Sequence, residues 1–134
     1  VLLLNTNSSN ETSSSFPRVA YIIFSHLETT ERFEKLIFPS LDTWYNNTSN
    51  NIPLYVVLAK KWKSKYEDLL FGANTTNTSI YTKYASRIEP IFVDCPEGYY
   101  GEAPCCKQDK GLTMIQQSYD FYVYMDDDVY IRHD

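Results

Sequence analysis

The chain has 134 residues and a mass of 15.6 kDa, a size that suits one domain with one hydrophobic core. Hydrophobic residues make up 43% of it and charged residues 22%, so the chain can bury a core and is not disordered as a whole. The formal net charge of −5 comes without a visible basic face, which argues against nucleic acid as a partner. No stretch approaches the ~20 consecutive apolar residues that span a bilayer.

Residues 1–16 are predicted to form a flexible, glycosylatable stem. The apolar run Val1–Leu4 precedes a polar tract that has no means of packing. This order is what remains when a signal-anchor helix is cut through. The chain also opens without methionine and stops at Asp134, directly after an acidic motif. We therefore expect a piece of a longer protein, in which residues 17–134 are the N-terminal part of a folded domain.

Acceptor sites for N-glycosylation are over-represented. The chain carries six Asn-x-Ser/Thr triplets, whereas its 9 Asn and 23 Ser or Thr residues predict about 1.5 by chance. Loops rich in these residues would also produce such triplets incidentally, but their spread over three segments favours a protein of the secretory pathway. The six asparagines are Asn7, Asn10, Asn46, Asn47, Asn74 and Asn77.

The hydrophobic pattern predicts strands that alternate with helices. Four short apolar runs have the composition of buried strands, at residues 18–25, 53–58, 87–94 and 121–125. Helices are expected over residues 31–44, with an interruption at Pro39, over 60–70 and over 109–119, and loops over 72–79 and 95–107. This alternation predicts an α/β fold, with a mostly parallel sheet and helices on both faces, whose ligands bind beyond the carboxyl ends of the strands.

Three consecutive aspartates follow the last predicted strand. Because alternate residues of an extended chain point to the same side, Asp126 and Asp128 are expected to face one ligand while Asp127 points away. Carboxylate oxygens select hard or borderline ions such as Mg²⁺ or Mn²⁺, which neutralise a diphosphate leaving group. The alternative is a solvated turn rich in aspartate.

Three cysteines, at positions 95, 105 and 106, lie close together in the sequence. In a secretory-pathway protein this number indicates one disulfide and one leftover thiol. Zinc is disfavoured because the cluster lacks paired Cys-x-x-Cys spacing and both histidines are distant in sequence.

The chain resembles the Fringe-like β-1,3-glycosyltransferases. In that family an aromatic-rich strand runs into an Asp-Asp-Asp motif followed by an aromatic and an aliphatic residue, as in Phe121–Ile131 here. A Thr-Thr pair follows the family's first strand, and its next helix ends in Asp/Glu-Thr-Trp. An Asn/Asp-Cys follows its third strand, and a later Cys-Lys opens the helix before the acidic motif. The corresponding residues here are Thr29-Thr30, Asp42-Thr43-Trp44, Asp94-Cys95 and Cys106-Lys107.

The resemblance implies the donor-binding half of a GT-A fold that uses a UDP-sugar. Asp128 and Asp126 would hold Mn²⁺ (or Mg²⁺), with Asp126 near the ribose and Asp127 among the donor-binding residues. Lys107 would approach the diphosphate, unless it is a surface lysine at a helix start. It further implies a Cys95–Cys106 disulfide, a hexosyltransferase activity toward a glycan or glycoprotein acceptor, and a type II membrane protein of the Golgi lumen, or a secreted one.

The segment Thr29, Thr30 and Arg32 would lie beside the uracil and ribose. Arg32 would then contact a phosphate or the base, unless it faces solvent.

Two features depart from the family pattern. Fringe-like proteins often carry a cysteine where this chain has Val123, which leaves Cys105 without an assigned partner. The catalytic base of the family lies beyond the acidic motif, so here it is expected beyond Asp134. Asp94, Glu97 and Glu102 are the nearby acidic candidates, but they lie in the loop before the last predicted helix, where the donor is expected rather than the acceptor. We therefore expect no sugar transfer by residues 1–134 alone.

Two other interpretations are open. Tyr124–Asp127 spells the active-site tetrapeptide of reverse transcriptases, but a polymerase palm needs basic surfaces and a hairpin. A non-catalytic lumenal metal- or glycan-binding domain, with Ca²⁺ held by the aspartates, is the second alternative to the transferase.

Overall fold

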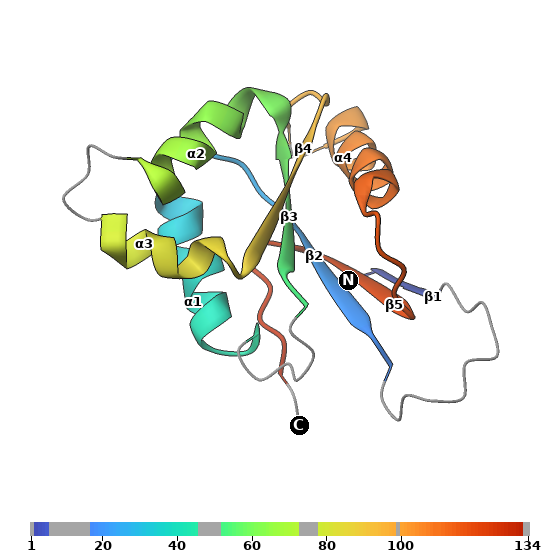
Figure 1. Ribbon diagram of the computed structural model, residues 1–134. Coiled ribbons are helices and arrows are strands. Elements are labelled where there is room, and N and C mark those ends of the chain that lie inside the picture. Colours follow the sequence, from blue (N-terminus) through green and yellow to red (C-terminus); the bar gives the residue numbers. More distant parts are fainter. Residues whose placement is uncertain (1, 6–16, 46–51, 73–77, 99, 133–134) are drawn as a thin grey trace.

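The computed structural model describes residues 2–5, 17–45, 52–72, 78–98 and 100–132. Its centre is a five-stranded sheet in the order β1-β5-β2-β3-β4 (Figure 1). Four neighbouring strands are parallel, and β1 pairs antiparallel with β5 at the edge. The strands are β1 (Leu2–Asn5), β2 (Val19–Phe24), β3 (Leu54–Ala59), β4 (Ile88–Val93) and β5 (Phe121–Asp126). The predicted mostly parallel α/β sheet is confirmed.

The sheet separates two hydrophobic cores. Parallel register aligns Ile23 of β2 with Val56 of β3 and Met125 of β5, so these three side chains share one face. Their sequence neighbours Ile22 and Tyr124 belong to the core on the other face. Every residue of β3 is buried, because both faces of this central strand are covered.

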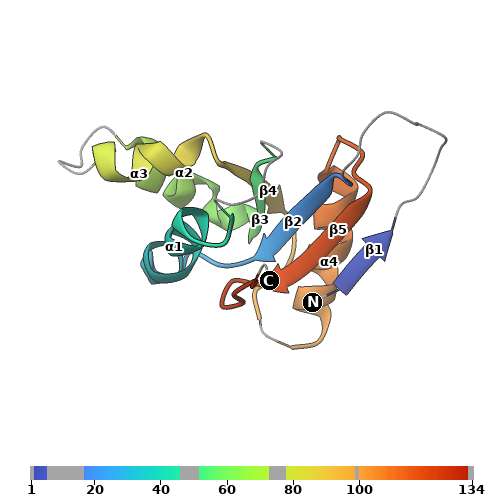
Figure 2. The ribbon, with the colours of Figure 1, turned by 90° about the horizontal axis from the view of Figure 1, so that it is seen from below.

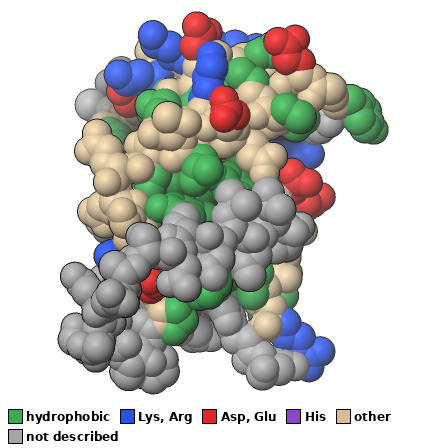
Figure 3. Space-filling view, turned by 90° about the vertical axis from the view of Figure 1, so that its right-hand side faces the viewer, with side chains coloured by type: hydrophobic (Ala, Val, Ile, Leu, Met, Phe, Trp, Pro, Cys, Tyr) green, Lys and Arg blue, Asp and Glu red, His purple; other side chains and the backbone are tan. Residues whose placement is uncertain are grey.

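One face carries the helices that precede β4, and the other carries α4 (Figures 1 and 2). The first group contains α1 (Phe38–Asp42), α2 (Lys63–Phe71) and α3 (Thr78–Ala85), and α4 spans Glu102–Met114. The side of the molecule that carries α4 shows acidic and basic side chains intermixed at its upper end, with hydrophobic side chains below them (Figure 3). Helices therefore lie on both faces, as predicted.

Pro39 produces the expected interruption in the first helical region. Its ring nitrogen cannot donate the hydrogen bond of a regular α-helix. The chain before it, Phe33–Ile37, winds as a π-helix, and the N–H of Phe38 reaches the carbonyl of Phe33. α1 then begins with Pro39 in its first turn, where a missing N–H is harmless.

The structure adds a helix that was not predicted and corrects the start of another. The added helix is α3, which begins at Thr78, inside the expected loop 72–79. Helix α4 begins at Glu102, inside the expected loop 95–107. The earlier start of α4 tolerates Pro104, since a proline in the first turn loses no hydrogen bond. α4 also ends at Met114, because the next residue, Ile115, adopts an extended backbone.

The N-terminal segment departs from the expected stem at residues 2–5. These residues form β1, which pairs with β5 in the register Leu2 to Tyr124 and Asn5 to Phe121. The strand that leads to the acidic motif therefore has partners on both sides. Residues 2–5 thus cover the hydrogen-bonding edge of β5.

All six predicted glycosylation sites lie outside the described residues. Within those residues, no helix is long and apolar enough to cross a membrane.

Candidate functional site

The order of the strands predicts a ligand-binding crevice at the carboxyl ends of β2 and β5. From β2 the chain moves to β3 and β4 on one side, and β5 then lies on the other side of β2. At such a switch point the connections diverge beyond the carboxyl ends and leave a crevice. A pocket of about 640 Å³ opens there. It is lined by Phe24, Ser25, His26, Glu28, Lys61, Trp62, Glu97, Gly98, Pro104, Lys107, Asp126, Asp127 and Asp128.

The acidic motif combines a strand end with a turn. β5 ends at Asp126, and the N–H of Val129 donates to the carbonyl of Asp126 at 3.3 Å. The extended backbone assumed for all three aspartates is therefore wrong beyond Asp126. The side chains nevertheless divide into two classes, since Asp126 and Asp128 are exposed and Asp127 is buried.

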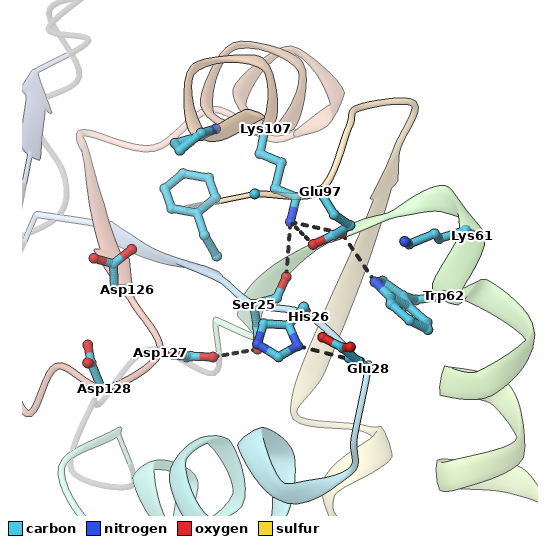
Figure 4. Close-up of a pocket in the computed structure, with 13 residues that line it drawn as sticks. Ser25, His26, Glu28, Lys61, Trp62, Glu97, Lys107, Asp126, Asp127 and Asp128 are labelled. Carbon is cyan, nitrogen blue, oxygen red and sulfur yellow. Dashed lines mark hydrogen bonds and ion pairs between the residues drawn. The ribbon is translucent and has the colours of Figure 1, made fainter. Parts of the chain in front are cut away.

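Asp127 holds the end of the motif against neighbouring elements. One carboxylate oxygen accepts from the Ser25 hydroxyl, just beyond β2, at 2.6 Å. The other accepts from the Arg32 guanidinium, at the helix start, also at 2.6 Å. Only 5% of the Asp127 side chain is exposed, so both bonds compensate a carboxylate that has lost most of its water. The turn is thereby fixed, and the two outer aspartates line one side of the pocket (Figure 4).

A buried ammonium enters the pocket from α4. Lys107 is 6% exposed, and its Nζ lies 3.1 Å from Oε1 of Glu97 and 3.4 Å from the carbonyl of Ser25. Figure 4 shows this side chain pointing down from the helix toward the ends of the strands. The pocket therefore contains one buried cation near a set of exposed carboxylates.

The predicted disulfide between Cys95 and Cys106 is confirmed. Their Cα atoms lie 5.8 Å apart, and the bond joins the segment after β4 to the first turns of α4. Glu97 lies within the closed loop and Lys107 follows its second cysteine, so the bond brings these partners together. Cys105 is a free, exposed thiol.

The wall opposite the aspartates comes from the end of β3. Trp62 lies in the short 3₁₀ helix Lys60–Trp62, and its Nε1 donates to Glu97 at 3.2 Å. Lys61 lies beside it, across the pocket from Asp126 and Asp128 (Figure 4).

Aromatic packing supports the strand that leads to the aspartates. Tyr124 stacks on Phe24 with ring centroids 5.5 Å apart. Burial raises the pKa of the Tyr124 phenol, and nearby Tyr122 and Asp109 add to the rise, so this side chain stays neutral at physiological pH.

Several predicted site residues lie elsewhere. Thr29 and Arg32 border a smaller hollow of about 330 Å³ that shares only His26 with the main pocket. Thr30 lines neither hollow, and its carbonyl accepts the N–H groups of Phe33 and Glu34 at the helix start. The acidic motif and the segment 29–32 thus border different hollows, which are joined by the shared His26 and by the ion pair of Arg32 with Asp127.

Other lining residues were missed from the sequence. His26 and Glu28 place an imidazole and a carboxylate in the pocket. Glu97 also lines it and was already named from the sequence as a nearby acidic residue. Nδ1 of His26 accepts the N–H of Glu28 at 3.4 Å. The available signal was position, because residues 26–28 directly follow the predicted strand 18–25, and ligands bind beyond the carboxyl ends of parallel strands.

The donor set fits a metal ion that is shared with a substrate. Among the described residues, no group of three His, Cys, Asp or Glu side chains is placed to hold an ion. Mg²⁺ is usually bound by one or two carboxylates together with water and substrate phosphates, and Asp126 and Asp128 supply such a pair.

Comparison of the chain with protein-family models, with curated proteins and with solved structures gives no match.

Proposed function

We propose that this chain is the donor-binding part of a glycosyltransferase that uses a UDP-sugar and a divalent ion. The observation that carries the proposal is the division of labour within the acidic motif at the switch point of the sheet. Asp127 is buried and holds the turn, while Asp126 and Asp128 present their carboxylates to the pocket. A solvated turn rich in aspartate would not need a buried ion pair at its centre.

The charges of the pocket suit a metal-bound diphosphate. Asp126 and Asp128 would hold Mn²⁺ or Mg²⁺, and the ion would neutralise the leaving diphosphate. Lys107 would bind a phosphate oxygen from the opposite side, through an ammonium that Glu97 and the Ser25 carbonyl already orient. Acidic side chains otherwise outnumber basic ones in the lining, so a free diphosphate would be repelled.

The acceptor would be a glycan or glycoprotein, and the compartment the Golgi lumen, with the protein anchored as a type II membrane protein or secreted. These points rest on the Fringe-like motifs and on the six glycosylation triplets.

The two alternatives find less support. A dedicated Ca²⁺ site takes six to eight oxygen ligands, and the described residues offer no group of three acidic side chains. A polymerase palm presents its motif in a hairpin, whereas Tyr124–Asp127 ends a strand that runs parallel to β2.

The test uses Trp62, one of two tryptophans in the chain and the one that lines the pocket. UDP is titrated with and without Mn²⁺ while tryptophan fluorescence is recorded, and calorimetry confirms the stoichiometry. We expect saturable binding that requires Mn²⁺ and that Asp128→Asn or Asp126→Asn weakens at least about tenfold, since each removes a charged ligand.

Asp68→Asn is the matched control, because Asp68 is exposed on α2 outside the pocket. It should leave the affinity unchanged. Binding of UDP that is independent of Mn²⁺, or equal in Asp128→Asn and the control, would reject the proposed function.

A further inference from the structure

A run of lysines surrounds the start of α2, at the carboxyl end of β3. Lys60, Lys61, Lys63 and Lys65 are four of the chain's 12 basic residues, within six positions. The first three are exposed, and within the described part of the chain no carboxylate forms an ion pair with them. Lys65 is half-buried and donates to the carbonyl of Glu28 at 2.7 Å.

These lysines are unfavourably placed for an isolated helix. The first N–H groups of a helix carry partial positive charge, so cations near them are repelled. Neither the 3₁₀ helix Lys60–Trp62 nor α2 has an acidic residue in its first turn to compensate. A bound anion would relieve the repulsion from the lysines and from the helix dipole together.

The position of the run separates it from the donor pocket. Lys61 and Trp62 line the pocket on the wall opposite the aspartates (Figure 4). Lys60 and Lys63 are not among the lining residues. A diphosphate held near Lys107 would therefore leave Lys60 and Lys63 unused. Only a ligand that extends out of the pocket along this rim would contact the whole run.

Trp62 adds a surface for a sugar ring. Its indole is half-buried, and the ammonium groups of Lys61 and Lys65 lie 4.7 and 5.5 Å from the ring centroid. Both ammonium groups stand over the ring, so a pyranose that packs on it must displace the exposed Lys61 ammonium from the ring, and an acidic substituent of the sugar would then pair with the displaced cation.

We propose that residues 60–65 bind an anionic oligosaccharide, whose sulfate or carboxylate groups pair with the lysines while a sugar ring packs on Trp62. The inference rests on the proposed function, in which this oligosaccharide is the acceptor. The surface of an acidic membrane carries negative charge as well. Trp62, however, lines a pocket and does not lie on an outward face, which favours an oligosaccharide over a membrane surface.

The probe is a heparin-derived hexasaccharide, compared with its desulfated form by calorimetry in the absence of UDP and Mn²⁺. We expect binding that requires sulfate and weakens between about 50 and about 200 mM salt, as for other polyanions. Lys60→Gln with Lys63→Gln should weaken it about tenfold or more. Lys35→Gln with Lys83→Gln changes the net charge equally on other helices and should leave it within about twofold.

Equal binding by the two double variants, or equal binding of the desulfated form, would overturn the proposal. Tighter binding to vesicles of anionic lipid than to the hexasaccharide would assign the surface to a membrane and also overturn it. Failure of Mn²⁺-dependent UDP binding with retained hexasaccharide binding would reject the donor function alone. Retained Mn²⁺-dependent UDP binding without hexasaccharide binding would reject only the proposed acceptor surface at residues 60–65.

Discussion

The guanidinium of Arg32 lies 2.6 Å from the carboxylate of Asp127, although 95 residues separate them along the chain. The contact joins the start of the first helical region to the turn that follows β5. It gives the buried middle aspartate of the motif an ion-pair partner, and it engages Nη1 of the Arg32 guanidinium. The same contact makes the three aspartates separable by experiment.

Asp127→Asn should lower the free energy of unfolding by about 1–2 kcal/mol, since it leaves Arg32 facing a neutral partner. The loss stays this small because the Arg32 side chain is 32% exposed, so solvent screens part of its attraction to Asp127. Asp128→Asn should change stability by less than about 0.5 kcal/mol. Urea unfolding measures both, and a cycle with Arg32→Gln should show coupling for Asp127 and none for Asp128.

The pair Lys107–Glu97 should respond asymmetrically. Glu97→Gln leaves an unpaired ammonium on a Lys107 side chain of which only 8% is exposed, whereas Lys107→Met leaves a carboxylate on a Glu97 side chain that is 25% exposed and still bonded to Trp62. The first change should therefore destabilise the fold more than the second, by about 1 kcal/mol or more. Equal losses in urea unfolding would show that the ammonium is not as desolvated as its surroundings indicate.

Loss of the disulfide should loosen the pocket as well as the fold. Cys95→Ser with Cys106→Ser opens a loop whose ends are 11 residues apart, which the chain-entropy model values at about 3 kcal/mol. Hydrogen exchange of the amides in residues 95–101 should increase more than that of β2. Cys105→Ser is the control, since this thiol is exposed and unbonded, and it should leave stability unchanged.

Gly111→Ala should destabilise the chain although alanine is the better helix former. An added Cβ would lie 2.9 Å from Cγ2 of Val57, a fully buried side chain of β3. Overpacking of about 1–3 kcal/mol outweighs the gain of about 1 kcal/mol in helix propensity. Thermal unfolding measures the net loss. Combination with Val57→Ala, which removes the clashing methyl groups, should cost less than the sum of the single changes.

Stability should fall above about pH 10, where tyrosines of the unfolded chain ionise. Burial raises the pKa values of Tyr45, Tyr55, Tyr66 and Tyr124, so these phenols stay protonated in the folded chain while their unfolded counterparts release protons. The stability contribution is constant below pH 10 and decreases as pH rises beyond it. Urea unfolding across this range, in Cys105→Ser to prevent exchange with the disulfide, measures the decrease. Ionisation of tyrosines can be followed by absorbance at 295 nm. If all tyrosines of the folded chain ionised together near pH 10, the predicted loss of stability would be contradicted.

The sequence alone determined the class of fold and the place of the acidic motif. Buried parallel strands must be apolar throughout, so β2, β3 and β5 were visible as short hydrophobic runs, and the aspartates after β5 necessarily fell at a carboxyl end. Pro39 likewise predicted its own interruption, because a missing N–H acts locally. Such features depend on near neighbours in the chain.

Only the tertiary structure decided which charged groups share the pocket. The pairing of Asp127 with Arg32 and Ser25, and the approach of Lys107 to Glu97, depend on the order of the strands and on the side of the sheet that α4 covers. Neither contact can be predicted from a local sequence pattern, since the type of a residue does not say whether its side chain is buried or exposed. Burial converts one of three identical aspartates into a structural anchor, because a carboxylate that loses its water must find partners wherever the fold places them.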